Sequence, residues 1–474
     1  MIPLTLAQVA HAVGGRLAAG ADPARAVTGP VVADSRLMAQ GGLFVALPGE
    51  RVDGHDFAPA AVAAGAVAVL AAREVGVPAI LVDDPLAALG ALARTVVDGL
   101  PELTIVALTG SSGKTTTKDL LAGLLRRLGP TVAPRGSFNN ELGLPLTVLT
   151  VEPDTAYLVA EMGARAVGHI RYLCAITPPR IGLVLNVGAA HVGEFGSREV
   201  TAQAKGELVE GLPATGVAVL NADDPLVAAM ASRTAGRVLT FGEAEDAHVR
   251  AVDIRLDEQA RAGFRLVTAG GEAPVTLRLH GRHMVGNALA AAAVALTAGL
   301  DVDAVAAGLT EAEPVSRWRM EVTARPDGIV VVNDAYNANP DSVEAALNAL
   351  VEMAPPGRPP NRRWAVLGEM LELGPDGPTV HAGLGARAHE LGVQRLIAVG
   401  PGARPYLDGW AVAGGTGGTG GQAADGVAEA LSLLRGQLEP GDVVLVKASR
   451  AIGLDRLGAQ LLLEPLGTVV GGSS

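Results

Sequence analysis

Apolar residues fall along the chain in short runs that alternate with helix-like segments. The clearest run, TIVALTG at 104–110, has the character of a buried strand, and apolar positions at helical spacing follow between Lys114 and Leu128. Hydrophobic strands separated by helices are typical of a mostly parallel sheet. The alternation therefore predicts an α/β fold. Similar strand-like runs lie at 156–163, 180–188, 216–224, 328–334, 363–369, 395–400 and 442–449.

The pattern changes in two places, and the changes indicate domains. An Ala-rich mixed segment, with short strand-like runs at 43–47 and 67–72, ends near residue 98, and a new α/β series begins near 315. Between 247 and 280 apolar and polar residues alternate, which predicts a small antiparallel patch, and an Ala-rich helix follows at 286–298. A chain of 474 residues is longer than one hydrophobic core usually serves. We expect an N-terminal mixed α/β domain, a central domain with a mostly parallel sheet plus the antiparallel patch, and a C-terminal Rossmann-like domain. Their predicted bounds are 1–98, 99–314 and 315–474.

Composition narrows the classes of function. The 49 acidic and 37 basic residues give a formal net charge of −12, which argues against nucleic acid or an anionic membrane as a partner. Aromatic residues make up 3% of the chain, so stacking platforms for bases or sugars are few. The single cysteine, Cys174, can form neither an intrachain disulfide nor a cysteine metal cluster, which fits a reducing cytoplasm. We expect Cys174 to be buried as a small hydrophobe.

Two uncharged stretches, 57–72 and 283–300, could be mistaken for membrane segments. Both are dominated by Ala and are interrupted by Pro or Gly, whereas a spanning helix needs about 20 strongly apolar residues. We interpret both as packed helices of a soluble domain. The N-terminus lacks the basic residues of a signal peptide before Arg16 and predicts a short helix with Thr5 as its N-cap. The chain is expected to have no membrane span and to be cytoplasmic.

The strongest local signal is TGSSGKTT, which lies between a predicted strand and a predicted helix. Small residues let successive backbone N–H groups face a phosphate, and the N-terminus of the helix adds positive potential. Lys114 would supply a mobile charge, and Thr115 a hydroxyl ligand for Mg²⁺. The strict motif has glycine six positions before the lysine, where this chain has Leu108. An ordinary strand–helix turn is the alternative, but the context favours a site for ATP. The predicted nucleotide residues are Thr109, Gly110, Ser111, Ser112, Gly113, Lys114, Thr115 and Thr116.

Three side chains follow the loop at suggestive positions. Glu161 ends one predicted strand, His191 follows the next, and Lys205 lies on the helix after that. Groups at the carboxyl ends of neighbouring parallel strands face the ligand crevice, and a carboxylate suits Mg²⁺, which prefers oxygen ligands. Taken singly, each could be a solvated or structural residue. Their order behind the phosphate loop favours catalysis.

Eight further phrases, in the same order along the chain, resemble the Mur ligase family. The resemblance leaves 225–280 and about 400–440 uncovered. The phrases are TGSSGKTTTKD, GSFNNELGLPLT (136–147), AEMGA, NVGAAHVGEFGS with AKGE, SRWRMEV (316–322), NDAYNANPDS (333–342), LGEMLELG (367–374) and VLVKASRAIGLDRL (444–457), with DSR (34–36) and FVALPGERVDGHDF (44–57) matching the family's N-terminal domain.

The resemblance implies a substrate domain, a central ATPase and a C-terminal ligase domain that closes over the nucleotide. Within the family it points to the type that adds D-alanyl-D-alanine to UDP-N-acetylmuramoyl-tripeptide during peptidoglycan precursor synthesis. ATP would phosphorylate the terminal carboxylate, and the amine of the dipeptide would attack the acyl phosphate. Activation is chemically required, because a carboxylate has no adequate leaving group. A monomer is expected.

The resemblance also implies roles residue by residue. Lys114, Glu161, His191 and Lys205 would be catalytic, with Thr115 and Glu161 on one Mg²⁺, His191 at a second metal site and Lys205 carbamylated beside them. Further nucleotide contacts would be Asn287, Arg319 and Asp334. Predicted substrate contacts are Asp34, Ser35, Arg36, Asn139, Asn140, Asn337, Lys447, Ser449 and Arg450.

Several alternatives stay open at this point. On a strand, Arg317 and Arg319 would share one face, so either could reach ATP, and Ala448 stands where the family more often has Gly. A phosphotransferase or nucleotide switch could use the same loop, but the chain has no N-K-x-D tetrad. A kinase would not need the three residues behind the loop. A non-catalytic nucleotide-binding scaffold is disfavoured because every expected ATP-site residue is present. The sister ligase that adds diaminopimelate commonly has D-N-P-R, which is absent, and folylpolyglutamate synthetase fits the phrases poorly.

Overall fold

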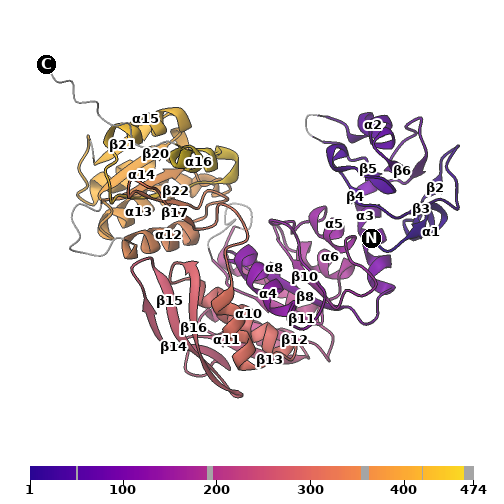
Figure 1. The fold of residues 1–474 in the computed structure, drawn as a ribbon, viewed down its shortest axis with the longest axis horizontal. Coiled ribbons are helices and arrows are strands. Elements are labelled where there is room, and N and C mark those ends of the chain that lie inside the picture. Colours follow the sequence, from indigo (N-terminus) through magenta and orange to yellow (C-terminus); the bar gives the residue numbers. More distant parts are fainter. Residues whose placement is uncertain (50–51, 189–195, 354–361, 419, 464–474) are drawn as a thin grey trace.

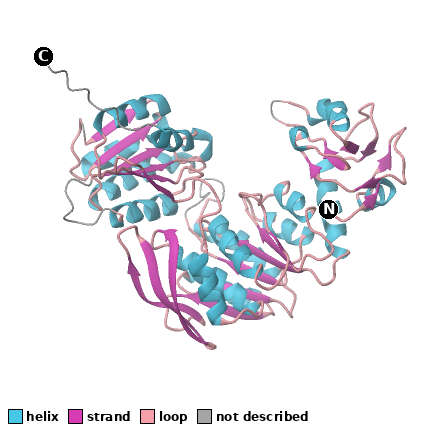
Figure 2. Ribbon diagram, in the orientation of Figure 1, coloured by secondary structure: helices cyan, strands magenta, loops and turns pink. Residues whose placement is uncertain are grey.

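The computed structural model describes residues 1–49, 52–188, 196–353, 362–418 and 420–463, which form three α/β lobes in the order of the chain (Figure 1). Each lobe contains a sheet with helices packed against it, as the colouring by secondary structure shows (Figure 2). The mixed α/β class that the apolar pattern predicted is therefore confirmed. No helix within the described ranges is long and apolar enough to cross a bilayer.

The N-terminal lobe has a sheet in which β2 pairs antiparallel to β7 and the other neighbours are parallel. Helix α1 (Leu6–Ala12) begins at Thr5, whose side chain forms the predicted N-cap in a capping box with Gln8. The strands, in sheet order, are β2 (Arg16–Leu17), β7 (Ala79–Leu81), β6 (Ala66–Ala71), β5 (Gly42–Val45) and β4 (Val31–Val32), and β1 (Leu4–Thr5) pairs with β3 (Ala26–Val27).

The interpretation of 57–72 as a packed helix is wrong beyond residue 63, whereas the strand-like run at 67–72 is confirmed by β6. Helix α2 (Ala58–Ala63) ends after six residues, and Gly65 takes a φ of +115°, which an L side chain rarely adopts. The chain then turns into β6, whose buried residues suit a central strand. The reading of 283–300 is confirmed, because α10 (Met284–Thr297) is a packed helix of the central lobe.

The central lobe contains the longest run of paired strands. From β9 to β14 neighbouring strands are parallel, and β14, β15 and β16 form the predicted antiparallel patch. In sheet order they are β16 (Gly271–His280), β15 (Arg261–Thr268), β14 (Val249–Leu256), β13 (Arg237–Gly242), β12 (Val217–Asn221), β11 (Ile181–Val184), β8 (Thr104–Thr109), β10 (Tyr157–Glu161) and β9 (Thr131–Val132).

Strand β8 shows how helices cover both faces of this sheet. Val106 and Leu108 pack into the core under α4, α10 and α11, whereas Ile105 and Ala107 pack on the other side with α5, α6 and α8. Cys174 of α6 is buried in the second core, as expected, and burial raises the pKa of its thiol to about 12. The helices are α4 (Lys114–Leu125), α5 (Gly143–Val148), α6 (His169–Ile176), α8 (Arg198–Glu210), α9 (Pro225–Ala228) and α11 (Val302–Glu311).

Helix α3 (Pro85–Asp98) joins the first two lobes. Asp84 caps its N-terminus by accepting hydrogen bonds from the N–H groups of Leu86 and Ala87. Leu89, Leu92 and neighbouring apolar residues of α3 enter the same core as α5 and α6. The N-terminal lobe is thus packed against the central one through this helix (Figure 1).

The C-terminal lobe has a sheet that is parallel except for its edge strand β17. In sheet order the strands are β17 (Glu321–Ala324), β18 (Val330–Asn333), β22 (Val443–Lys447), β19 (Arg363–Gly368), β20 (Arg395–Val399) and β21 (Gly421–Ala424). The helices are α12 (Pro340–Glu352), α13 (Gly377–Glu390), α14 (Pro405–Val412), α15 (Val427–Gln437) and α16 (Asp455–Leu463). Parallel strands between helices fit the predicted Rossmann-like lobe.

The order of the central strands fixes where a ligand can bind. Strand β8 lies between β10 on one side and β11 on the other, so the strands that follow it in sequence are added on both of its sides. Open parallel sheets bind ligands at such switch points, outside the carboxyl ends of the strands. The loop after β8 and the ends of β10 and β11 therefore meet at one edge, which faces the C-terminal lobe.

Candidate active site

The phosphate loop connects β8 to α4 by a turn that depends on glycine. Gly113 takes a φ of +78° immediately before α4, and a Cβ at this position would lie 2.4 Å from Oδ1 of Asn287. Asn287, from α10, is buried and packs its carboxamide directly against the loop. The side chain predicted to contact the nucleotide thus also supports the turn that carries the amides predicted to bind phosphate.

Not all of the loop amides are available to a phosphate. Oδ1 of Asn186 accepts hydrogen bonds from the N–H groups of Ser111 (2.9 Å) and Ser112 (3.0 Å). The N–H groups of the first turn of α4, by contrast, have no acceptor within the helix. We therefore narrow the predicted cradle to the amides of Gly113 to Thr116. Asn186 was missed from the sequence, although its place directly after a strand-like run was a signal.

Lys114 is held at the start of α4. Its Nζ donates a hydrogen bond to the carbonyl of Gly110 at 2.6 Å. Loss of hydration lowers the pKa of Lys114; the carboxylate of Glu161 opposes this shift, and the charge of Arg319 adds to it. A lysine, an arginine and a carboxylate therefore act on one another across the site, which is an arrangement suited to an anionic phosphate chain and a cation.

Glu161 is the last residue of β10 and is fully buried. Its Oε1 accepts a hydrogen bond from Nδ2 of Asn139 (2.8 Å) and lies 3.4 Å from Oγ1 of Thr115. The other oxygen, Oε2, is buried and has no hydrogen-bond partner within the described residues. An orphaned carboxylate oxygen beside a threonine hydroxyl fits Mg²⁺, which typically takes one or two carboxylates and keeps several waters. No larger group of His, Cys, Asp or Glu with metal-ligand spacing occurs in the part of the chain that the structure describes.

Lys205 points from α8 into the same site, where it is 2% exposed. In the described ranges it has neither an ion-pair nor a hydrogen-bond partner. Burial lowers the pKa of its amine well below the usual value, and the charge of Lys114 lowers it further. Burial therefore shifts the equilibrium toward the neutral amine, which is the nucleophilic form.

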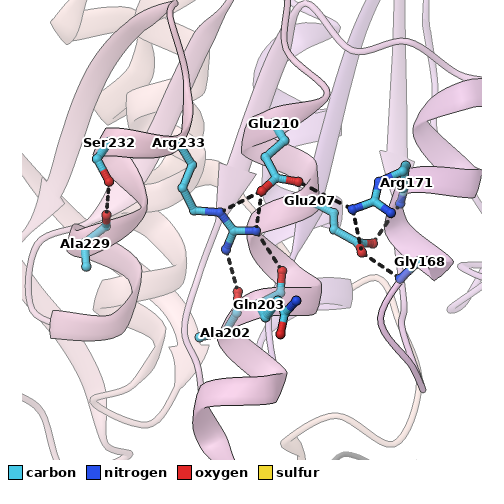
Figure 3. A network of polar contacts seen from close by, with 9 residues as sticks. All are labelled: Gly168, Arg171, Ala202, Gln203, Glu207, Glu210, Ala229, Ser232 and Arg233. Atoms are coloured by element: carbon cyan, nitrogen blue, oxygen red, sulfur yellow. Dashed lines mark hydrogen bonds and ion pairs between the residues drawn. The ribbon is translucent and has the colours of Figure 1, made fainter.

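A polar network fixes the helix that carries Lys205 (Figure 3). The carboxylate of Glu207 accepts from the backbone N–H groups of Gly168 (2.6 Å) and Arg171 (3.0 Å), which ties α8 to the N-terminus of α6. Arg233 lies flat against α8 where Gly206 has no side chain, since a Cβ there would be 1.7 Å from its guanidinium. The guanidinium donates to the carbonyls of Ala202 (3.1 Å) and Gln203 (2.9 Å) and to the carboxylate of Glu210 (2.7 Å).

The C-terminal lobe completes a cavity of about 590 Å³. Nζ of Lys447 lies 2.5 Å from Oδ2 of Asp334 and 3.1 Å from the carbonyl of Asn337, so the ends of β18 and β22 are joined by a buried ion pair. The N–H of Met320 donates to Oδ1 of Asp334 at 3.0 Å. Predicted residues that line the cavity are Ser111, Ser112, Gly113, Lys114, Thr115, Thr116, Asn139, Asn140, Glu161, Lys205, Asn287, Arg319, Asp334, Asn337 and Lys447.

The arginine that faces the cavity is Arg319. Residues 317–320 form a turn rather than a strand, and Trp318 (φ +59°) and Met320 (φ +50°) both adopt the left-handed conformation. The argument that Arg317 and Arg319 share a strand face is therefore wrong. Arg319 lines the cavity, and Arg317 is absent from the described residues that do so.

Other predicted residues lie elsewhere. His191 falls outside the described residues. Of the described residues, Thr109 and Gly110 come just before the first lining residue, Ser111, and do not line the cavity themselves. Asp34, Ser35 and Arg36 are in the N-terminal lobe. Hydrogen bonds from Arg36 lower the pKa of Asp34 to about 2. Ser449 accepts a hydrogen bond from the N–H of Leu371 (2.9 Å), and Arg450 lies 4.1 Å from the ring centroid of Trp318. These two residues support the walls of the cavity and do not line it.

Tyr336 and His283 are examples of lining residues that had no role in the sequence interpretation. Tyr336 stood in the quoted phrase NDAYNANPDS, but nothing in the phrase pointed to a contact. His283 is the N-cap residue of α10. Loss of hydration lowers the pKa of its imidazole to about 4; Asp334 opposes this shift and Lys447 adds to it. Both residues are brought to the site by the meeting of two lobes, which sequence patterns do not reveal.

A phosphate loop at a switch point, facing a second nucleotide-type α/β lobe, defines a multidomain enzyme that uses a nucleoside triphosphate. Three family models match the chain: "Mur ligase family, catalytic domain" at 30–96, "Mur ligase middle domain" at 108–295 and "Mur ligase, glutamate ligase domain" at 318–450. The chain is 51% identical to a UDP-N-acetylmuramoyl-tripeptide--D-alanyl-D-alanine ligase of Mycobacterium bovis, over 98% of each chain.

Solved structures agree with these matches. MurF from Acinetobacter baumannii has a TM-score of 0.87 and 33% identity, over 98% of this chain and 99% of that one. MurF ligase from Thermotoga maritima in complex with ADP has a TM-score of 0.79 and 31% identity, over 92% and 98%. The chain belongs to the Mur ligase family, and it is a three-domain, ATP-dependent ligase.

Proposed function

We propose that this ligase joins D-alanyl-D-alanine to the tripeptide of UDP-N-acetylmuramoyl-tripeptide and converts ATP to ADP and phosphate. The observation that carries the proposal is the cavity between two lobes, in which Lys114, Glu161 and Arg319 meet. A chain about half identical to relatives of that name, over nearly its whole length, supports the substrates.

The site suits carboxylate activation. The amides at the start of α4, together with Lys114 and Arg319, bind and orient the phosphates of ATP, so that the γ-phosphoryl group transfers to the terminal carboxylate of the tripeptide. The amine of the dipeptide then attacks the acyl carbon, a tetrahedral intermediate forms, and phosphate leaves with its bonding electrons. Positive groups on both walls stabilise the negative charge that develops in each step.

Thr115 and Glu161 would hold a Mg²⁺ ion, which neutralises phosphate charge when it is bound. We keep a second metal site, with His191 as a ligand, as part of the proposal. Lys205 would carry a carbamate: its neutral amine attacks CO₂, a C–N bond forms, and one proton is released. Burial and the absence of a charged partner among the described residues support this role.

The predicted substrate contacts divide by position. Asn139, Asn140, Asn337 and Lys447 line the cavity and would face the reacting ends. Asp34, Ser35 and Arg36 would contact the UDP-muramoyl end in the N-terminal lobe, while Ser449 and Arg450 would act from behind the wall. We retain domain bounds of 1–98, 99–314 and 315–474, which separate the paired sheets. We also propose that the protein is a monomer in the cytoplasm. The free, buried thiol of Cys174 fits a reducing compartment.

The test offers purified protein ATP, Mg²⁺, UDP-N-acetylmuramoyl-tripeptide and D-Ala-D-Ala, and measures phosphate release and the mass of the product. Tripeptides ending in diaminopimelate or in lysine are supplied in parallel to identify the third residue. Ligation of the dipeptide, lost in Lys114→Ala, is the expected result. Phosphate release with free diaminopimelate and the UDP-muramoyl substrate one residue shorter, but not with the tripeptide and D-Ala-D-Ala, would instead indicate the sister ligase.

A further inference from the structure

Tyr336 connects the two lobes at the mouth of the site. It lies in the loop after β18 of the C-terminal lobe and lines the cavity. Its hydroxyl is hydrogen-bonded to Oγ of Ser137, which belongs to the central lobe. Its ring lies under Arg319, whose Cζ is 4.1 Å from the ring centroid. One side chain thus contacts both the arginine of one lobe and a loop of the other.

The loop that contains Ser137 leads directly to Glu161, the carboxylate proposed to bind Mg²⁺. Ser137 lies two residues before Asn139, and Asn139 donates to Oε1 of Glu161 at 2.8 Å. Asn140 fixes the same loop by accepting from the N–H of Gly143 at 2.9 Å. Through Tyr336, the position of Arg319 is therefore connected to the loop that holds Glu161.

Arg319 needs an external support. It lies between Trp318 and Met320, which both have positive φ, and such strained turns persist only where their surroundings hold them. Its Nε is buried with no hydrogen-bond partner in the described part of the chain. The backbone N–H of Tyr336 donates to the carbonyl of Trp318 at 3.1 Å, so the same residue holds the turn as well as the guanidinium.

We propose that Tyr336 is a positioning residue with two separable roles. Its ring holds Arg319 over the nucleotide cavity, and its hydroxyl, through Ser137, couples closure of the C-terminal lobe to the loop of Asn139 and Asn140. The second role rests on the proposed function, because it concerns turnover of the ligated substrates. The first does not, because it concerns the nucleotide alone.

The two roles separate in a pair of variants. Tyr336→Phe keeps the ring over Arg319 and loses the hydroxyl, whereas Tyr336→Leu loses both. We expect Tyr336→Leu to raise the KM for ATP and the Kd for ADP by about 3- to 30-fold, the range of a cation–π contact. In Tyr336→Phe both should stay within about 2-fold of the wild type, while kcat falls by about 2- to 10-fold, as for one lost hydrogen bond.

Ser137→Ala removes the same hydrogen bond from the other side. It should reproduce the kcat of Tyr336→Phe, and the double variant should lose no more than either single variant. Tyr157→Phe, on β10 outside the lining, removes a hydroxyl as a matched control and should leave the kinetics unchanged. Multiplicative losses in the double variant, or a rise in the Kd for ADP in Tyr336→Phe equal to that in Tyr336→Leu, would overturn the proposal. If no variant or wild type ligates the dipeptide, the proposed function fails, and the ADP affinities still decide the role of the ring.

Discussion

Nδ2 of Asn139 lies 2.8 Å from Oε1 of Glu161, so the amide occupies one carboxylate oxygen and leaves the other, Oε2, buried and unpartnered in the described residues. A buried carboxylate oxygen is unfavourable unless it gains a partner. The hydrogen bond from Asn139 fixes the orientation of the carboxylate, and the unpaired oxygen is directed to a ligand. Glu161 is thus arranged for binding a cation at some expense of stability.

This arrangement predicts that Glu161→Gln separates stability from function. Glutamine can still accept from Asn139 through Oε1, and it removes a buried charge, so thermal unfolding without Mg²⁺ should occur at the same temperature or higher. The factor by which Mg²⁺ lowers the Kd for ADP should shrink by more than about 100-fold in this variant, because a metal ligand is lost. Titration calorimetry with and without Mg²⁺ measures both affinities, and the Mg²⁺-free affinity serves as the control. A variant whose ADP affinity responds to Mg²⁺ as the wild type does would contradict this role.

Gly113 and Gly123 form a matched pair of glycines in and near α4. An alanine at 113 must adopt a φ of +78° and meets Oδ1 of Asn287 at 2.4 Å, whereas nothing lies within 4 Å of a Cβ at 123. We expect Gly113→Ala to reduce the free energy of unfolding by about 1–2 kcal/mol and to weaken ADP binding. Gly123→Ala should stabilise the helix by up to about 1 kcal/mol. Urea unfolding compares the two, and equal effects would show that the loop geometry is not what Gly113 provides.

Local patterns were sufficient for the parts of the fold that are built from neighbours in sequence. The β8–loop–α4 unit, the antiparallel patch and the N-cap at Thr5 each depend on residues a few positions apart. The failures have equally local causes. Residues 57–72 were interpreted as a packed helix because Ala dominates them, although 67–72 was also strand-like. Gly65 ends α2, and the buried remainder fits a sheet better.

The site was predictable where it follows the phosphate loop in sequence and less so where two lobes meet. The direction of Arg319 depends on a turn with two positive φ angles, which periodicity does not indicate. Asn186 and Tyr336 act through contacts with residues 75 and 199 positions away. Such contacts are set by strand order and by lobe packing rather than by any motif.

The buried amine of Lys205 leads us to expect that replacing this lysine makes the protein more stable but inactive. Burial lowers the pKa of its amine well below the unfolded value of about 10.4, so below about pH 10 the unfolded state binds this proton more strongly than the folded state does. This difference destabilises the fold at neutral pH, and the loss shrinks as pH rises toward about 10. In buffer free of Mg²⁺ and bicarbonate, Lys205→Met should therefore be more stable than the wild type by on the order of 1–3 kcal/mol at pH 7, and the gain should diminish at higher pH.

Urea unfolding across pH measures this gain, and dipeptide ligation by the same variant should be lost. Lys118→Met is a useful comparison, because the amine of Lys118 is also buried but donates to the carbonyl of Pro134 at 2.9 Å and pairs with Asp119 at 2.7 Å. Removing a satisfied amine should destabilise the protein. A Lys205→Met variant that loses stability as Lys118→Met does would refute the view that Lys205 is an unpaired, neutral amine.

The contact between Gly206 and Arg233 predicts strong coupling between two substitutions. In Gly206→Ala the new Cβ displaces the guanidinium, which loses its hydrogen bonds to the carbonyls of Ala202 and Gln203, so the fold should lose about 1–2 kcal/mol. In an Arg233→Ala background the three atoms nearest to the new Cβ are absent, and the alanine should instead stabilise α8 by up to about 1 kcal/mol through its higher helix propensity. Urea unfolding of the four variants in a double-mutant cycle gives the coupling energy.

If Gly206→Ala destabilises equally in both backgrounds, the glycine serves some purpose other than making room for Arg233. If the single variants also lose ligation while the double variant recovers part of it, the orientation of α8, and with it the direction of Lys205, depends on this contact.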